Sequence, residues 1–359
     1  MKRQVVKMEL SLEQKEVVYT TKPYSVVLCA AAAGKTHCLT ERIRWLIEER
    51  HINPNQIVAI TFTNLAADNI LRRLKNPKGI HISTVHSYAS YLLKCCGYDV
   101  SEAVENEDFD KLFEMVRLHP DCIQPVQYLF LDEAQDSTAE QFDFLIDMIK
   151  PKNFMLIGDL RQTIYQFNGS RPDMLLRIMN QPDVSIFKLT QNYRNAQQIL
   201  SFAKQTIAQK GWDYRDDSRA MTENSGTVQF INWSSFLNLV QQIKNKQDYK
   251  DWFILCRSNR QVEEMQALLN VQKIPNDTFK MKNMTVAHLN ELMEKNSVKV
   301  LTIHSAKGLE ADNVVIYGAI NKWNSDEVFV NYVAITRAKK NLFWVSKRRG
   351  AAKKIQEWD

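Results

Sequence analysis

A Gly-Lys-Thr tripeptide, Gly34 to Thr36, has the side chains needed to bind a phosphate chain. The lysine can reach the β- and γ-phosphate oxygens, and the threonine hydroxyl can serve Mg²⁺ at a helix N-terminus. The tripeptide stands between an apolar run at 26–29, typical of a buried strand, and a helical pattern of apolar residues from Leu39 to Ile47. The stretch predicts a strand, a phosphate loop at residues 30–36 and a helix. The expected nucleotide contacts are Ala32, Ala33, Gly34, Lys35 and Thr36.

The match is limited to the core of the motif. The full pattern has glycine five residues before Gly34, where this chain has Cys29. Chance occurrence of the tripeptide at an ordinary helix start is the alternative, so a partner motif is needed.

A second apolar run, 128–131, supplies that partner because it ends in Asp132 and Glu133. One carboxylate can join a Mg²⁺ shell, and the other can orient or deprotonate an attacking water. A capped strand end is the alternative for such a pair. The phosphate loop upstream favours the nucleotide interpretation.

The elements that must position these residues alternate between strands and helices, which predicts parallel sheets with functional loops at the carboxyl ends of the strands. Further strands of the first unit are expected at 57–61, 80–83 and 154–159, with helices at 65–74 and 84–93. A second α/β unit is expected with strands at 184–188, 228–231, 252–256, 298–302, 314–317 and 342–345. Its helices are expected at 196–208, 260–270 and 326–338. We place the domain boundary near residue 186, which gives domains 1–186 and 187–359.

Composition is that of a globular protein with two domains: 359 residues, 45% hydrophobic and 25% charged. No apolar stretch is long enough to span a membrane and no signal peptide is recognisable, so we expect a cytoplasmic protein without a membrane partner. The six cysteines have neither disulfide-framework nor zinc-site spacing and are expected to be reduced thiols. The net charge of +6 favours an anionic partner.

Seven further motifs follow in a fixed order. They are 61–64 (TFTN), 84–87 (TVHS), 132–136 (DEAQD), 158–165 (GDLRQTIY), 191–194 (QNYR), 302–310 (TIHSAKGLE) and 332–338 (YVAITRA). With Gln14 and the phosphate loop, this set resembles the superfamily 1 DNA helicases of the UvrD/Rep/PcrA type over nearly the whole chain. The resemblance implies two RecA-like domains of the α/β, P-loop NTPase class, each a mainly parallel sheet flanked by helices. It also implies a translocase or helicase that uses ATP and Mg²⁺ on single-stranded DNA, with 3′-to-5′ direction.

The resemblance further assigns roles within the nucleotide site. Lys35 and Thr36 would hold phosphate and Mg²⁺, Asp132 would serve Mg²⁺, Glu133 would be the catalytic base, and Gln162 would sense the γ-phosphate or position water. Arg194 and Arg337 resemble the two arginine fingers, Gln14 and Tyr193 the adenine contacts, and Glu310 a ribose contact. Each motif has an alternative when it is taken alone. Asn-Tyr-Arg at a helix start would be a cap with a surface ion pair, and Gln14 would be a solvated side chain.

Candidates for the DNA strand fall into two groups. The aromatic residues Phe62, Tyr165 and Phe167 could stack on bases, which contributes ~1–3 kcal/mol per base whatever the sequence. Core packing is the alternative for Phe62 and Tyr165. The polar candidates for phosphate or sugar are Thr61, Asn64, Thr84, His86, Thr302 and His304.

Three departures limit the resemblance. Ala32 and Ala33 stand where the family has glycine and serine or threonine, and a left-handed backbone at Ala32 would cost on the order of 1–2 kcal/mol. The family's two large insertions are reduced to an acidic, irregular segment at about 95–126 and a remnant at about 271–297. Relatives also have an aromatic-tipped, strand-separating hairpin after the last motif, whereas Lys347 to Gly350 lacks an aromatic residue.

We therefore expect a DNA-stimulated ATPase and translocase more than an efficient lone helicase. The alternative is a nucleotide-gated DNA-binding or regulatory subunit with weak ATPase, which would be the partner of a nuclease or of a replication or repair protein.

Overall fold

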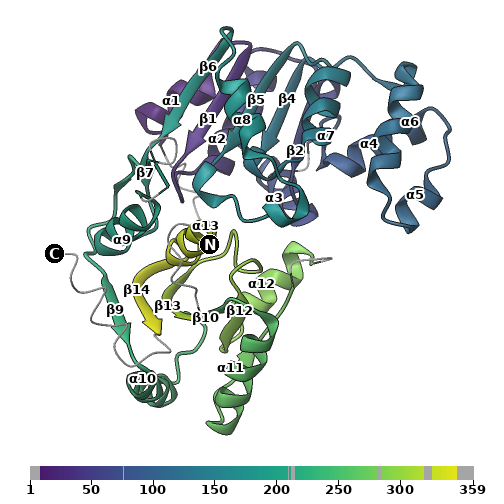
Figure 1. The fold of residues 1–359 in the computed structure, drawn as a ribbon. Coiled ribbons are helices and arrows are strands. Elements are labelled where there is room, and N and C mark those ends of the chain that lie inside the picture. The colour runs from purple at the N-terminus through teal and green to yellow at the C-terminus, as the bar shows by residue number, and fades with distance from the viewer. Residues whose placement is uncertain are drawn as a thin grey trace, which may run out of the picture. The chain divides into compact units, whose positions relative to one another are not determined.

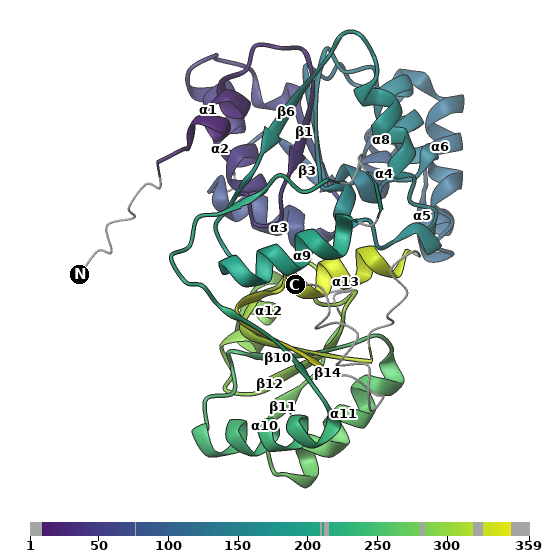
Figure 2. The ribbon, with the colours of Figure 1, turned by 60° about the vertical axis from the view of Figure 1, so that its left-hand side comes forward.

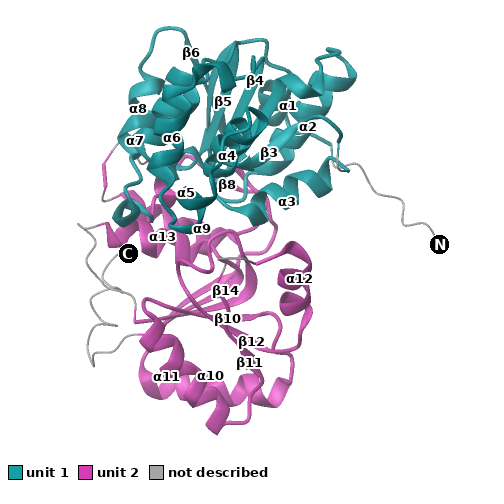
Figure 3. Cartoon of the chain, turned by 90° about the vertical axis from the view of Figure 1, so that its right-hand side faces the viewer, with its two compact units in different colours: residues 1–159, 165–190 teal, residues 160–164, 191–359 magenta. Residues whose placement is uncertain are grey.

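The computed structural model describes residues 9–75, 77–208, 210–211, 215–280, 284–318 and 326–345. The chain forms two compact units, shown in different colours in Figure 3. Unit 1 comprises residues 1–159 and 165–190, and unit 2 comprises residues 160–164 and 191–359. The short segment 160–164 thus packs with the second unit although the chain on both sides of it belongs to the first.

Unit 1 is built on a six-stranded parallel sheet with strand order β3-β2-β4-β5-β1-β6 (Figure 1). The strands are β1 (Tyr24–Cys29), β2 (Ile57–Thr61), β3 (His81–Thr84), β4 (Tyr128–Asp132), β5 (Asn153–Gly158) and β6 (Val184–Leu189). The helices are α1 (Leu12–Tyr19), α2 (Lys35–Glu48), α3 (Asn64–Arg73), α4 (Val85–Cys95), α5 (Ser101–Glu105), α6 (Phe109–Leu118), α7 (Ala139–Phe142) and α8 (Pro172–Met179).

The junction of β1 and α2 follows directly from the residue pattern. Val27 is fully buried in β1, and Leu39, Ile43 and Leu46 bury one face of α2 in the same core. This spacing of three or four residues is the apolar stripe of an amphipathic helix. The phosphate loop is therefore fixed at both ends by packing.

The strand expected at 184–188 belongs to the first unit and not, as the sequence predicts, to the second. Val184–Leu189 pairs in parallel with β1 along its whole length, so β6 is the edge strand of the first sheet. The division into compact units consequently lies after Thr190 and not at residue 186. Strand periodicity identifies a strand but carries no information about which sheet it joins.

The acidic segment at 95–126 is also more regular than expected. It contains α5 and α6, and α6 packs on α4 through the buried residues Leu112, Phe113 and Val116 (Figure 1). The acidic composition of the segment gives no sign of this helix, whereas the spacing of Leu112, Phe113 and Val116 does.

Unit 2 holds a second six-stranded parallel sheet, with strand order β11-β12-β10-β13-β14-β9. The strands are β9 (Thr227–Ile231), β10 (Trp252–Cys256), β11 (Asn276–Asp277), β12 (Val298–Thr302), β13 (Ala311–Tyr317) and β14 (Ala338–Val345); a separate pair consists of β7 (Gln191–Asn192) and β8 (Arg219–Ala220). The helices are α9 (Gln197–Ala208), α10 (Trp233–Lys246), α11 (Asn259–Val271), α12 (Val286–Glu294) and α13 (Glu327–Ile335). Helices α9 and α13 lie side by side (Figure 2).

The two parallel sheets with flanking helices confirm the expected fold class. The remnant insertion at 271–297 consists of little more than β11 and α12 within its described residues. Lys347 to Gly350 lies outside the described residues. No helix that the structure describes has both the length and the apolar character that a membrane span requires.

Candidate nucleotide and nucleic-acid sites

The phosphate loop has the left-handed backbone that a phosphate cradle uses. Gly34 has φ +83°, and Ala32 has φ +56°. A side chain at position 34 would lie 2.9 Å from the Gln14 amide nitrogen, so only glycine fits there without displacing Gln14. Cys29 is fully buried at the end of β1, and burial raises the pKa of its thiol, which keeps the side chain neutral.

Lys35 and Glu133 form an ion pair at the carboxyl edge of the first sheet. Lys35 Nζ donates to Glu133 Oε1 at 2.6 Å, with only 13% of the lysine side chain exposed. Burial alone would lower the pKa of Lys35, but the carboxylates of Glu133 and Asp132 raise it above its ordinary value. The lysine is therefore a permanent cation where β- and γ-phosphates would lie.

Glu133 is held in a strained backbone conformation, with φ +54°. Its backbone N–H donates to Asp132 Oδ1 at 3.0 Å, and its second carboxylate oxygen accepts from Gln135 Nε2 at 2.6 Å. Such strain persists only where surrounding contacts over-determine it, and it is characteristic of active sites.

Gln135 is a positioning residue that sequence reasoning missed. Its side chain is fully buried, and its Oε1 accepts from the backbone N–H of Asp159 at 3.0 Å. A Cβ on Gly158 would lie 2.6 Å from that oxygen, so the glycine at the end of β5 makes room for the amide. The only signal in the sequence was a polar residue inside the DEAQD motif.

Gln14 lies against the phosphate loop. Its Nε2 donates to the Ala33 carbonyl at 3.2 Å, and its Oε1 accepts from the Ser11 backbone at 3.0 Å as part of the capping box of α1. The amide is thus oriented from both ends, which a solvated glutamine would not be.

The Mg²⁺ candidates are consistent with an ion held jointly by protein and phosphate. Thr36 lies in the first turn of α2, and Asp132 ends β4 and is 5% exposed. The described residues contain no cluster of three or more His, Cys, Asp or Glu side chains able to hold a metal alone. Mg²⁺ commonly takes one or two carboxylates with the remainder of its shell from water and substrate phosphates, so these residues fit it.

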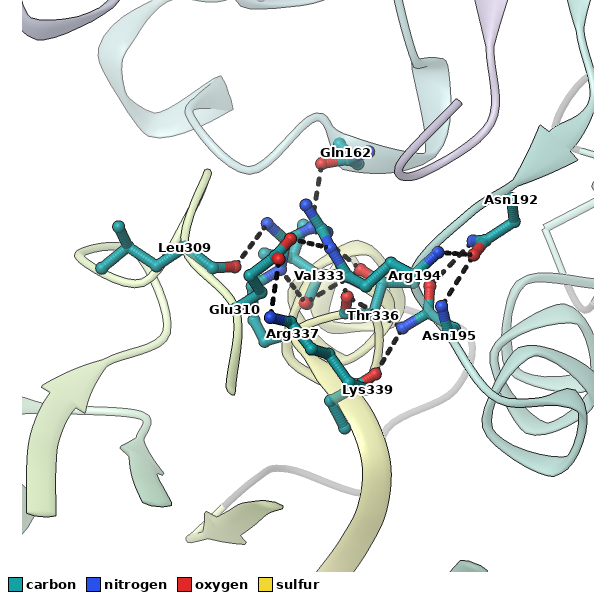
Figure 4. A network of polar contacts seen from close by, with 11 residues as sticks. Gln162, Asn192, Arg194, Asn195, Leu309, Glu310, Val333, Thr336, Arg337 and Lys339 are labelled. Atoms are coloured by element: carbon teal, nitrogen blue, oxygen red, sulfur yellow. Dashed lines mark hydrogen bonds and ion pairs between the residues drawn. The ribbon is translucent and has the colours of Figure 1, made fainter. Parts of the chain in front are cut away.

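In unit 2, Arg194 is bound to an acidic partner (Figure 4). Its Nε donates to Glu310 Oε2, and its Nη1 donates to the Thr336 carbonyl at 3.2 Å. Lys339 Nζ lies 2.9 Å from the other Glu310 oxygen. Burial would raise the pKa of Glu310, but Arg194 and Lys339 hold it below its ordinary value, so this carboxylate stays ionised.

Arg337 and Gln162 meet within the same network (Figure 4). Arg337 is 2% exposed, and its Nη2 donates to Gln162 Oε1 at 3.3 Å. The guanidinium also donates to the carbonyls of Val333 and Leu309. The Gln162 carbonyl accepts from Lys307 Nζ at 2.9 Å. Unit 2 therefore brings together three of the four predicted catalytic residues, and Glu133 belongs to unit 1.

Asn195 connects the chain segments that carry the two arginines. It is fully buried, and its Nδ2 donates to the carbonyls of Thr336 at 3.1 Å and Ala338 at 2.6 Å. Its Oδ1 accepts from Asn192. Asn195 lies outside all of the motifs, and a single asparagine after Arg194 gives no signal of burial in the sequence. Tyr193 beside it is 47% exposed and donates to Gln191 Oε1.

The three aromatic candidates form one cluster in unit 1. The rings of Phe62 and Tyr165 stack at 4.9 Å with an interplanar angle of 25°, and Phe167 lies 6.1 Å from Tyr165. Phe62 is 36% exposed and Phe167 is 71% exposed, so core packing does not describe these two. Tyr165 is more covered, and burial raises the pKa of its hydroxyl.

Beside this cluster is a pocket of about 140 Å³ that Thr61, Phe62, Thr84 and His86 help to line. Most of the polar candidates already make internal hydrogen bonds. Thr61 donates to the Thr63 carbonyl, Thr84 caps α4, and His86 stacks on Phe109 at 4.3 Å and contacts Gln141.

The other polar candidates differ in exposure. Asn64 is exposed at the start of α3. In unit 2, Thr302 lies 2.9 Å from the Ser305 hydroxyl, and burial together with Arg257 lowers the pKa of His304. These two residues follow one another closely at the carboxyl end of β12.

Two family models match the chain. The model of the UvrD/REP helicase N-terminal domain matches residues 10–119 and 109–183, and the model of the UvrD-like helicase C-terminal domain matches residues 276–349. The matched ranges contain every motif named above except QNYR.

Similar proteins include a "Probable DNA helicase" of Mycoplasma pneumoniae, 25% identical, with 94% of this chain and 83% of that protein covered. The "ATP-dependent DNA helicase Rep" of Buchnera aphidicola is 23% identical over 75% of this chain and 56% of its own length. The "ATP-dependent DNA helicase PcrA" of Staphylococcus aureus is 23% identical over 74% of this chain and 50% of its own length. The chain thus spans only about half the length of the last two relatives.

Proposed function

This chain belongs to the UvrD/Rep/PcrA family of superfamily 1 helicases, and we propose that it is an ATP-dependent motor on single-stranded DNA. The observation that carries the proposal is the contact of Lys35 with Glu133 beside a left-handed phosphate loop. A cation for phosphate, a carboxylate for water and a threonine for Mg²⁺ are the parts that phosphoryl transfer needs. The named relatives support the same assignment.

In this proposal, the γ-phosphate draws the Lys35 ammonium away from Glu133. The freed carboxylate, still oriented by Gln135, then accepts the proton of the attacking water. Thr36 and Asp132 would hold Mg²⁺, which would supply neutralising charge for the phosphate oxygens.

Arg194, Arg337 and Gln162 of unit 2 are the further residues to which we assign roles in hydrolysis. Guanidinium groups stabilise the charge that develops on the transferred phosphoryl oxygens, which is the role proposed for the two arginines. Arg194 would exchange Glu310 for phosphate, which leaves Glu310 available to the ribose. The motor direction that we propose, 3′ to 5′, rests on family membership.

On the nucleic-acid side, Phe62, Tyr165 and Phe167 would stack on bases without reading sequence. Thr302, His304 and Asn64 would contact the backbone. We also propose that a protein of a nuclease, replication or repair complex binds this chain while it acts on DNA.

The test is steady-state ATP hydrolysis with and without single-stranded DNA. Glu133→Gln should lower kcat by about 10³-fold and leave ATP binding in place, because the amide cannot accept a proton. Glu140→Gln, at an exposed acid of α7, is the control and should behave as the parent. Hydrolysis by Glu133→Gln at the parent rate would refute the assignment.

A second function is favoured by one observation. Ala32 adopts a left-handed φ that costs an alanine about 1–2 kcal/mol, so the chain could be a nucleotide-gated DNA-binding subunit with weak ATPase. DNA binding that changes with ATP, without DNA-stimulated turnover, would select this function.

A further inference from the structure

Trp233 is a large aromatic side chain that unit 2 leaves exposed. It is the first residue of α10, directly after the N-cap Asn232, and 42% of its surface is accessible. Trp252 and Trp344 are buried in the same unit, at 8% and 2%. Exposing an indole in this way forfeits the burial that normally stabilises it and leaves its ring face accessible.

Two aromatic residues brace the Trp233 ring. Phe236 lies 5.3 Å away at 47°, and Tyr317 lies 5.9 Å away at 50°. Both are buried, and the Tyr317 hydroxyl hydrogen-bonds to Glu264. A ring held by packing loses little conformational entropy when a ligand stacks on it.

The carboxyl edge of the second sheet connects Trp233 with the polar candidates of this unit. Strand pairing places five residues in one row across that edge: Thr302, Cys256, Tyr317, Val345 and Ile231. Strands lie ~4.8 Å apart, so this row spans roughly 19 Å from Thr302 to Ile231. Trp233 follows Ile231 by two residues, and its ring contacts Tyr317 in the middle of the row that begins with Thr302.

We propose that Trp233 stacks on a base of single-stranded nucleic acid and so adds an aromatic contact in unit 2. The inference rests on the proposed function and extends it to a residue outside every helicase motif named above. Stacking requires no particular base, which suits a strand that moves past the site. Ser234, the next residue of α10, is also exposed.

A protein partner is disfavoured by the isolation of the ring. The other exposed large hydrophobic side chains in the described part of unit 2 are Tyr193, Met221 and Val271. Val271 ends α11, and Tyr193 and Met221 directly follow β7 and β8. Protein-binding surfaces generally present contiguous apolar patches of several hundred Å². A lone, braced aromatic is instead the form of a base-stacking platform.

The experiment measures binding of a short oligo-thymidylate to the full chain. Trp233→Ala should raise Kd by about tenfold or more, and Trp233→Phe should retain most of the affinity because phenylalanine also stacks. Binding should quench tryptophan fluorescence in the parent, and Trp233→Phe should lose most of that quenching. Tyr91→Ala, which removes an aromatic residue of 47% exposure from α4, is the matched control and should bind like the parent.

The outcomes separate this inference from the function on which it rests. If Phe62→Ala weakens binding while Trp233→Ala and the quenching signal are unchanged, the motor assignment stands and the Trp233 inference is overturned. If the parent binds no oligo-thymidylate, both are overturned. Matching circular dichroism and melting temperatures would show that Trp233→Phe is folded, so its affinity and quenching decide the question even if Trp233→Ala is unstable.

Discussion

At the scale of single residues, the phosphate loop contains a conformational conflict. Ala32 has φ +56°, a region that alanine occupies at a cost of about 1–2 kcal/mol and glycine occupies freely. The neighbouring Ala33 is not among the described residues with positive φ. The conflict is therefore confined to one position of the loop.

Ala32→Gly should strengthen ATP binding or raise turnover by about fivefold, because it removes that strain. Equilibrium binding of ATP and steady-state hydrolysis would measure the gain. Ala33→Gly is the matched control, since it adds freedom where no left-handed backbone is present, and it should give no gain. Equal or lower activity in Ala32→Gly would show that the loop has adapted to alanine.

His81 gives unit 1 an acid-sensitive contact. Its ring packs against Tyr91 at 4.4 Å and Tyr88 at 4.8 Å, and burial lowers its pKa from 6.5 to about 4. The unfolded chain therefore binds a proton at higher pH than the folded chain does. The contribution of the neutral His81 to the free energy of unfolding is fully present above pH 6.5. It is lost as the pH falls from 6.5 to about 4.

His81→Phe should keep the ring contacts and remove this titration. We expect its free energy of unfolding to fall less than that of the parent when the pH is lowered across the window from 6.5 to about 4. Urea unfolding of parent and variant at both ends of the window measures the difference. An identical loss in the two proteins would exclude His81 as a source of acid sensitivity.

Much of the site could be predicted from residues because its chemistry needs particular side chains at particular spacings. Lys35, Glu133 and Arg337 are identifiable in this way. Gln135 and Asn195 could not be, because their roles depend on burial and on backbone groups distant in sequence. A pattern read along the chain does not show which carbonyls a buried amide will meet.

At the scale of elements, Asn195 fixes the start of α9 to the turn between α13 and β14. Both arginine candidates stand on the segments that it joins, Arg194 beside it and Arg337 in the turn. The link consists of two hydrogen bonds to carbonyls, so it depends on the amide donors and not on side-chain shape.

Asn195→Asp should lower kcat by about tenfold or more with little change in the KM for ATP, because a carboxylate facing two carbonyls would push the arginine segments apart. Asn195→Ser, which keeps one donor, should recover part of the rate. Steady-state kinetics of the three proteins provide the measurement. A rise in KM with unchanged kcat would contradict a role in positioning the arginines.

Elements were predictable wherever apolar spacing was sufficient, as for β2, β10 and α11. Two missed helices did carry signals. α8 begins with Pro172 at its first position, and α10 buries Phe236, Val240 and Ile243 on one face. The assignment of β6 could not be read from spacing, because its partner β1 lies far from it in the sequence.

At the scale of the whole molecule, the chain has the sequence motifs of the family but only a short segment at 271–297. Every motif from Gln14 to Arg337 is present. The segment at 271–297, where the resemblance implies a large insertion in the family, has only the end of α11, β11 and α12 as regular elements among its described residues. We propose that the motif residues are sufficient for movement along a single strand, and that the short segment at 271–297 does not hold a duplex at a fork.

The chain should therefore translocate on single-stranded DNA yet unwind duplex slowly. Separating a base-pair step costs about 1–2 kcal/mol. We expect a motor with so short a described segment at 271–297 to separate base pairs mainly by trapping thermal fraying. Fork unwinding should then fall steeply with GC content, whereas translocation should not depend on sequence, because stacking on Phe62 and Phe167 tolerates any base. A dye at the 5′ end of a single strand should report arrival, and the same dye at the 3′ end is the control for direction. Rapid unwinding of a long GC-rich duplex by this chain alone would contradict the passive mechanism, and arrival only at 3′ ends would contradict the proposed direction.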